Sequence, residues 1–197
     1  MYEWLPSWLG VETAKYKGYD PTVNPQVAVI FQSAAMRFGH TLVPPGVYRR
    51  DKNCKFYNTT EATKFAGKPA LRTCNAYWNP QEGVEEHDID AFLMGMASQI
   101  AEKEDMTITP DLKGDVFGPL EFSRRDLMAV NIQRARDHGL PDYNTARAAY
   151  GLPRRDSWEA INSSVTRETP EILVSFKELY GDSMDDIDIW PAGMLET

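Results

Sequence analysis

The stretch N-I-Q-R-A-R-D-H-G-L-P-D-Y-N, residues 131–144, decides most of what the sequence predicts. Its first residues continue an apolar helical pattern. The predicted helix then ends at Gly139 and Pro141, two residues that typically terminate a helix. Asn131 and Arg134 are one turn apart, so they share one face of this helix. Asn131 stands where an aliphatic side chain is expected, and a buried amide without partners costs roughly 1–3 kcal/mol. Either Asn131 bonds to the backbone of its own helix, or the helix carries a polar pair toward a partner in the core.

A second stretch, R-F-G-H-T at residues 37–41, has the same arrangement. Arg37 and His40 are one turn apart within residues 25–43, where the spacing of apolar side chains predicts one buried helix. Those apolar positions are Val27, Ile30, Phe31, Ala34, Ala35 and Phe38. A neighbouring guanidinium disfavours protonation of an imidazole, so we expect His40 to be neutral, the form that ligates a metal ion. The alternative is a surface arginine beside a buried histidine that bonds to a backbone carbonyl.

A histidine, an amide and two guanidinium groups together fit one wall of a haem pocket. These two stretches and four others resemble the animal haem peroxidases and, within that superfamily, the peroxidase-like ectodomain of dual oxidases. The four others are V-P-P-G-V-Y-R-R-D from Val43, L-R-T-C-N-A-Y-W from Leu71, F-L-M-G-M-A-S-Q-I from Phe92 and D-I-D-I-W-P-A-G-M-L-E from Asp186. The resemblance extends over residues 4–196.

The resemblance implies a mainly α fold with long loops and a haem b cofactor. It makes His40 the axial ligand of the iron and Asn131 the acceptor of the other ring N–H. It makes Arg37 and Arg134 the partners of the haem propionates. The activity it implies is reduction of hydrogen peroxide coupled to one-electron oxidation of a small-molecule donor, in the response to oxidative stress. The alternative is a non-catalytic, peroxidase-like ectodomain of a dual oxidase (an NADPH oxidase) that serves folding and partner docking.

The catalytic side of the superfamily's site is expected upstream of these stretches. Its distal histidine and arginine, and its calcium ligands, match nothing in this sequence. We therefore expect residues 1–197 to form a single partial domain, the proximal half, with no catalytic residue of its own. The remainder of the peroxidase domain is then a partner, and calcium belongs to the complete domain only. The first residues, M-Y-E-W, lack the basic and apolar regions of a signal peptide, as expected of an internal part of a longer chain.

The charge balance and the cysteines bear on partners and compartment. The 29 acidic and 21 basic residues give a net charge of −8, which argues against nucleic acid as a partner. No apolar run is long enough to span a bilayer. Cys54 and Cys74 are either unrelated thiols in a reducing compartment or a disulfide in an oxidising one. Glycosylation sequons at Asn58 and Asn162, together with the resemblance, favour the disulfide, both glycans and an extracellular or cell-surface location.

Other segments predict secondary structure of less specific meaning. Residues 46–82 predict loops, with short extended pieces near 47–48 and 55–57. From residue 89 an apolar stripe predicts a helix with one buried face, formed by Ile89, Phe92, Leu93, Met96 and Ile100, and Met94 and Met96 are expected in the core. Ser123 and Asp126 resemble a capping box for the helix that contains Asn131.

A further helix is predicted between Thr169-Pro170 and Gly181. Its expected buried face consists of Ile172, Leu173, Phe176, Leu179 and Tyr180. The other two histidines are not expected to be ligands. His138 is expected to cap helix carbonyls or to pair with Asp137, and His87 is expected in a solvated acidic turn.

Overall fold

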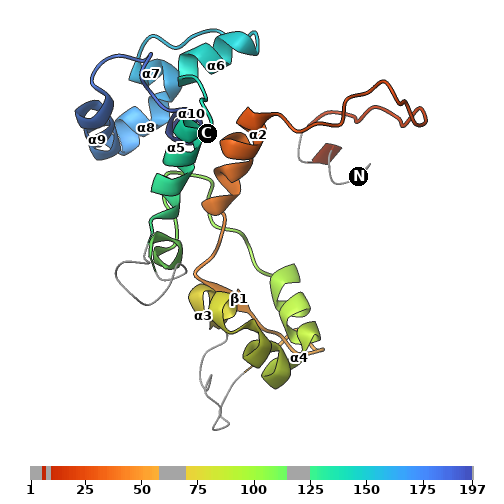
Figure 1. Ribbon diagram of the computed structural model, residues 1–197. Helices are drawn as coiled ribbons and strands as arrows, with labels where there is room; N and C mark the ends of the chain where they lie inside the picture. Colours follow the sequence, from red (N-terminus) through yellow and green to blue (C-terminus); the bar gives the residue numbers. More distant parts are fainter. Residues whose placement is uncertain (1–5, 8–9, 58–69, 115–124, 197) are drawn as a thin grey trace.

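The computed structural model describes residues 6–7, 10–57, 70–114 and 125–196, and it confirms the mainly α fold (Figure 1). The 3-10 helices are labelled η. In chain order the elements are α2 (Val29–Ser33), η1 (Ala35–His40), β1 (Gly46–Tyr48), β2 (Ala70–Arg72), α3 (Thr73–Trp78), α4 (Pro80–Ala97), η2 (Pro110–Lys113), α5 (Leu127–Asp137), α6 (Tyr143–Ala149), α7 (Trp158–Ile161), α8 (Ser163–Glu168), α9 (Pro170–Tyr180) and α10 (Ile189–Glu196). Among the described helices, none combines the length and the apolar character that crossing a membrane requires.

Two groups of elements lie at opposite ends of the molecule in Figure 1. Helices α5–α10, drawn in green to blue, form what we call the C-terminal unit, and β1, β2, α3 and α4 form the hairpin unit. The segment α2–η1 packs against α5 and α10 of the C-terminal unit. It therefore joins the two units, and it carries Arg37 and His40.

The C-terminal unit encloses a hydrophobic core of its own. The buried members of this core are Tyr143, Trp158, Ile161, Phe176, Met184, Ile187, Ala192 and Leu195. The rings of Trp158 and Phe176 meet edge to face with centroids 5.4 Å apart, and Phe176 stacks on Tyr180 at 6.0 Å. Burying a large apolar side chain contributes roughly 1.5–3 kcal/mol, so this cluster holds α6, α7, α9 and α10 together.

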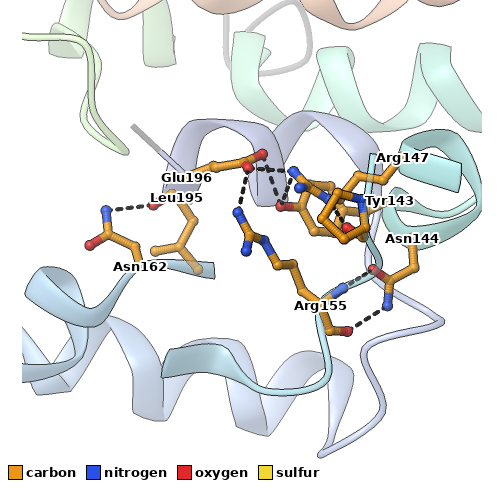
Figure 2. A network of polar contacts seen from close by, with 8 residues as sticks. Tyr143, Asn144, Arg147, Arg155, Asn162, Leu195 and Glu196 are labelled. Atoms are coloured by element: carbon orange, nitrogen blue, oxygen red, sulfur yellow. Dashed lines mark hydrogen bonds and ion pairs between the residues drawn. The ribbon is translucent and has the colours of Figure 1, made fainter. Parts of the chain in front are cut away.

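A polar network anchors the end of α10 to α6 and to the loop that follows α6 (Figure 2). The Glu196 carboxylate accepts a hydrogen bond from the Tyr143 hydroxyl at 2.9 Å and forms an ion pair with Arg147. Nη2 of Arg155 donates to the same carboxylate at 3.3 Å. Burial would raise the pKa of Glu196, but these donors outweigh burial and hold that pKa below its usual value. The network thereby fixes α10, the helix against which η1 packs.

The hairpin unit depends on a close approach of two backbones. Strands β1 and β2 pair antiparallel, with Gly46 opposite Arg72. Helix α4 crosses β1 at Gly95, where an added Cβ would lie 1.8 Å from the carbonyl oxygen of Tyr48. Beyond the crossing, Nε2 of Gln99 donates to the Gly46 carbonyl at 2.6 Å, and its Oε1 accepts from the Tyr48 N–H at 3.0 Å. Only glycine fits at this crossing.

The buried stripe predicted from residue 89 is wrong. Helix α4 already begins at Pro80, and its buried residues, among those whose side chains the structure describes, are Gly83, Ala91 and Gly95. Four of the five residues of the predicted stripe instead face solvent, with exposures between 49% and 89% at Ile89, Leu93, Met96 and Ile100, and Phe92 is half-buried. Met94 is half-buried, so Met96 is not a core residue and Met94 is only partly one. Apolar side chains occur on more than one face of α4, and the spacing alone did not show which face the chain covers.

Residues 25–43 do not form the single buried helix that their apolar spacing predicts. Helix α2 ends at Ser33, and Ala34 leaves the helical region with φ −128° and ψ −70° before η1 begins. Ser33 and Ala34 are buried, whereas Val27 and Phe31 are exposed. The prediction of helical structure around Arg37 and His40 is correct, but the predicted burial of the segment is wrong for half of its apolar face.

The remaining boundaries follow the predictions more closely. Strand β1 covers the extended piece near 47–48, and an isolated bridge between Arg50 and Phe56 covers the one near 55–57. Strand β2 and helix α3 lie within residues predicted as loop. Helix α9 begins at Pro170 and ends before Gly181 as predicted, but Leu179 on its expected buried face is 80% exposed.

Candidate functional site

Arg37 and His40 lie on η1, the 3-10 segment that follows the break after α2. A 3-10 helix has about three residues per turn, so side chains three residues apart point the same way. Nε of Arg37 donates to the carbonyl of Gln32 at 2.8 Å, which ties this arginine back to α2. The structure therefore places Arg37 and His40 on one side of their segment, as the sequence predicts.

Asn131 and Arg134 lie on α5, one turn apart. This helix begins at Asp126, whose carboxylate accepts hydrogen bonds from two backbone N–H groups of the first turn at 2.9 and 3.3 Å. Asp126 is thus the N-cap itself, not the third residue of a capping box, and Ser123 lies outside the described residues. The helix ends before Gly139, which has φ +67° as a C-terminal glycine should.

The two segments bring three buried polar atoms together. Asn131 is fully buried, and its Oδ1 accepts a hydrogen bond from Nη2 of Arg134 at 2.8 Å. Nδ1 of His40, Nδ2 of Asn131 and Nε of Arg134 are buried and have no hydrogen-bond partner among the described residues. The predicted hydrogen bond from the His40 ring to Asn131 is therefore not made at normal length and direction. Its donor and its acceptor residue nevertheless belong to one site.

The electrostatics of the site hold His40 neutral. Burial lowers the pKa of His40, and the positive charges of Arg37 and Arg134 lower it further. The Asn131 side chain acts in the opposite direction, which is the effect of an oxygen acceptor near a ring N–H. Burial, followed by the charge of Arg37, also lowers the pKa of Arg134. Two guanidinium groups thus act on a neutral imidazole.

These residues fit the haem group that the sequence implies. The neutral imidazole of His40 can offer a lone pair to a metal ion. Its buried Nδ1 lacks a partner and needs an acceptor, which the neighbouring amide of Asn131 can supply. Arg37 and Arg134 are two cations beside the imidazole, a pair that suits the two carboxylates of haem.

A contact that the sequence did not predict ties the two segments together. Oγ of Ser33, at the end of α2, lies 2.5 Å from Nδ1 of His138 and donates to Oε1 of Gln32 at 2.7 Å. His138 was expected to cap carbonyls or to pair with Asp137, but its Nδ1 bonds across to α2 instead. Ser33 is fully buried, so this contact fixes the helix of Asn131 against the segment that leads to His40.

Helix α10 supplies a second support that the sequence did not single out. Trp190 and Met194 are buried against Ala34 and against Phe38, which lies two residues before His40. The signal for this support is the apolar run I-W-P-A-G-M-L at 189–195, which is too short and too apolar all round to show its buried face. The polar network at the end of α10 therefore acts on the site through this packing.

The expected disulfide between Cys54 and Cys74 is not formed in the structure, where both are thiols. Cys54 is exposed with φ +62°, in a turn closed by the hydrogen bond from its N–H to the Asp51 carbonyl at 2.9 Å. Cys74 lies in α3, where its N–H donates to Oδ2 of Asp111 at 2.9 Å. Each cysteine is thus held by a separate local structure, and the disulfide stays a prediction that this structure does not show.

The two predicted glycosylation sites differ in what the structure says of them. Nδ2 of Asn162, the atom to which an N-linked glycan attaches, donates to the Leu195 carbonyl at 2.9 Å. Its Oδ1 accepts from the Ser164 N–H at 2.9 Å, so the half-buried amide is engaged at both ends and the geometry disfavours a glycan. Asn58 lies outside the described residues. His87 was expected in a turn, but its backbone lies in helix α4, and its side chain lies outside the described residues.

Comparison with known proteins gives one consistent family. The whole chain, residues 1–197, matches the family described as animal haem peroxidase. It is 46% identical over 197 residues to dual oxidase of Drosophila melanogaster and 40% identical over 199 residues to dual oxidase 1 of Homo sapiens. These alignments cover 100% of this chain but only 12% and 13% of the two relatives.

The fold agrees with the sequence match. Peroxidase A from Dictyostelium discoideum superposes on 99% of this chain with a TM-score of 0.80 and 31% sequence identity, and the match covers 34% of that chain. The chain thus spans a minor part of each relative, and Arg37, His40, Asn131 and Arg134 lie inside the matched part. From the family match over all residues, the identity to dual oxidases and the shared fold, we conclude that this chain belongs to the animal haem peroxidase family.

Proposed function

We propose that this chain forms the proximal side of the haem site in a peroxidase domain that reduces hydrogen peroxide and oxidises a small-molecule donor by single electrons. The observation that carries the proposal is the fully buried Asn131, bonded to Arg134, beside a neutral His40. A helix that needed only packing would hold an aliphatic side chain there. When bound, haem supplies the redox chemistry.

The residues of this chain hold and orient that group. His40 would offer the lone pair of its Nε2 to the iron, while Oδ1 of Asn131 would accept a hydrogen bond from the Nδ1–H of His40 and fix the ring. Arg37 and Arg134 would pair with the propionates. The peroxide-facing acid and base come from the remainder of the domain, as does calcium, and the domain lies outside the cell or at its surface.

Titration of the 197-residue chain with ferric haem tests the binding step. We expect a Soret band typical of histidine-ligated iron for the unaltered chain and at least about tenfold weaker binding for His40→Ala. The matched control is His138→Gln, which removes an imidazole outside the site and keeps a side-chain N–H for Ser33. If His40→Ala and the unaltered chain bound haem with equal affinity and equal spectra, His40 would be ruled out as the axial ligand.

Asn131→Asp sharpens the same experiment. A carboxylate is a stronger acceptor than an amide, so it makes the imidazole more imidazolate-like and lowers the reduction potential of the iron. The measurement is a spectroelectrochemical titration of the loaded chain. An unchanged potential counts against the pairing of Asn131 with His40.

Catalysis is tested separately from binding. The 197-residue chain with haem should oxidise donor about as slowly as free haem, because positioned general acid–base groups contribute roughly 10²–10⁴-fold and this chain supplies none. A longer chain with the complete domain should oxidise donor faster than free haem by roughly 10²–10⁴-fold. His40→Ala should abolish this rate increase. If the complete domain bound haem but oxidised no donor above free haem, the non-catalytic role in folding and partner docking would replace this proposal.

A further inference from the structure

The hydrogen bond from Arg134 to Asn131 gives that arginine a role that the pairing with propionates does not include. Nη2 of Arg134 donates to Oδ1 of Asn131 at 2.8 Å, and both residues lie on α5, one turn apart. Asn131 is fully buried, so water cannot take the place of this donor. The bond is therefore a fixed part of the helix face that meets His40.

The orientation of the Asn131 amide depends on this one bond. A side-chain amide can turn over and exchange its oxygen with its nitrogen, and the two ends have opposite hydrogen-bonding roles. Nδ2 of Asn131 is buried without a partner among the described residues, so it sets no preference. A guanidinium only donates, and it can face only the oxygen. Arg134 thus fixes the orientation of the Asn131 amide, because it holds Oδ1 and not Nδ2 toward its guanidinium group.

The choice matters for His40, because its Nδ1 is buried and has no partner of normal geometry among the described residues. The tautomer of an imidazole follows from the hydrogen bond at one of its nitrogens. An amide oxygen near Nδ1 keeps the proton there and leaves Nε2 with a free lone pair, whereas an amide N–H near Nδ1 reverses the assignment. Only the first arrangement leaves Nε2 able to ligate a metal ion.

We propose that Arg134 is a positioning residue, which holds the Asn131 amide so that its oxygen is the acceptor and thereby selects the Nδ1-protonated tautomer of His40. The benefit of that tautomer for iron ligation rests on the proposed function, but the selection itself is a property of the haem-free chain. Arg134 keeps its Nε for a further acceptor, so it can perform both roles.

The test uses the 197-residue chain without haem, labelled with ¹⁵N in its histidines, and measures the tautomer of His40 by NMR. Arg134→Met removes the donor and should shift His40 toward the Nε2-protonated tautomer. Arg134→Lys keeps a cationic donor and should retain most of the Nδ1-protonated form. The matched control is Arg37→Met, because Arg37 places a charge near His40 but bonds to the Gln32 carbonyl. This control should leave the tautomer ratio unchanged.

A double-mutant cycle shows whether Arg134 acts through Asn131. Asn131→Leu alone should shift the tautomer as Arg134→Met does, and adding Arg134→Met to Asn131→Leu should produce no further shift. An unchanged ratio in Arg134→Met, or an equal shift from it in the Asn131→Leu background, would overturn the proposal. In the unaltered chain, the Nη2 protons of Arg134 should exchange slowly with solvent and show NMR contacts to Asn131. If these protons exchanged fast and showed no such contacts, the proposal would be overturned, even where a variant fails to fold. Failure of haem to bind would sink the proposed function and leave these results untouched.

Discussion

The C-terminal unit and the hairpin unit hold their apolar residues in opposite ways. The C-terminal unit buries Trp158, Phe176 and Ile187 in a core of its own and anchors the last helix with an ionic network. The hairpin unit covers one side of α4 through a backbone crossing at Gly95 and leaves Leu93 and its apolar neighbours in solvent.

The contrast shows which part of the chain is structurally self-contained. A helix that is apolar on both faces needs a cover on both faces, and the described residues cover α4 on one face only. His40 lies on the segment between the two units, where support comes from the self-contained one.

The largest effect is expected at the backbone crossing of the hairpin unit. Gly95→Ala places a Cβ 1.8 Å from the Tyr48 carbonyl oxygen, so α4 must move away from β1 at a cost on the order of 3 kcal/mol. Chemical denaturation followed by circular dichroism measures the change. Gly193→Ala is the control in α10, because an added Cβ there meets no atom within 4 Å. Equal stabilities for the two variants would show that the crossing is not what holds the hairpin unit.

The next effect concerns the network that anchors α10. Glu196→Gln leaves the buried guanidinium of Arg147 without a charged partner, and hydrogen bonds to charged groups contribute about 1.5–3 kcal/mol. We expect a loss of about 2 kcal/mol in the free energy of unfolding. Arg154→Gln is the control, since its ion pair with Asp185 is exposed on both sides and such pairs contribute less than about 1 kcal/mol. A smaller loss for Glu196→Gln than for the control would contradict the assigned anchor.

Protonation of Glu196 at acidic pH should have a smaller effect of the same kind as Glu196→Gln. Asp188, just before α10, accepts hydrogen bonds from the Arg136 guanidinium and from the Tyr180 hydroxyl. The folded-state pKa values of Glu196 and Asp188 lie below their usual values, because the hydrogen bonds that each carboxylate accepts outweigh the opposing effect of burial. Their contribution to stability is therefore complete above the unfolded pKa values of about 4, and it is lost as the pH falls through the folded ones. Melting temperatures measured from neutral to acidic pH should decline in this window. Glu196→Gln should flatten part of the decline, and an identical profile for the variant would refute its share.

The smallest effect is expected on the exposed stripe of α4. Leu93→Gln should change the free energy of unfolding by less than about 0.5 kcal/mol, because the side chain is already in solvent. It should also reduce self-association, measured by light scattering, since exposed apolar patches promote it. Leu71→Ala is the control in the same unit, because Leu71 is buried and its truncation should cost about 2–5 kcal/mol. A large loss for Leu93→Gln would show that the chain itself covers the stripe.

The sequence predicted more about which residues form the site than about which apolar faces are buried. His40 and Asn131 can be recognised in the sequence, because a buried histidine beside an arginine and a buried amide in an aliphatic position both cost folding free energy unless they have partners. The bond from Arg134 to Asn131 is local to one helix, but which of its possible acceptors an arginine selects depends on what is buried around it. The contact between Ser33 and His138 joins residues from two helices, and no local pattern carries such a pairing.

The sequence by itself determined the mainly α fold, the helix that carries Asn131 and Arg134 and its end before Gly139, and the residues that meet at the site, because the end of a helix and residues one turn apart are local properties of the chain. The tertiary structure alone decided which apolar faces are covered, that Cys54 and Cys74 lie in separate structures, and that Glu196 anchors the helix behind His40. Apolar spacing identifies a face that prefers burial, but coverage requires a partner surface, and that surface comes from residues far away in the sequence.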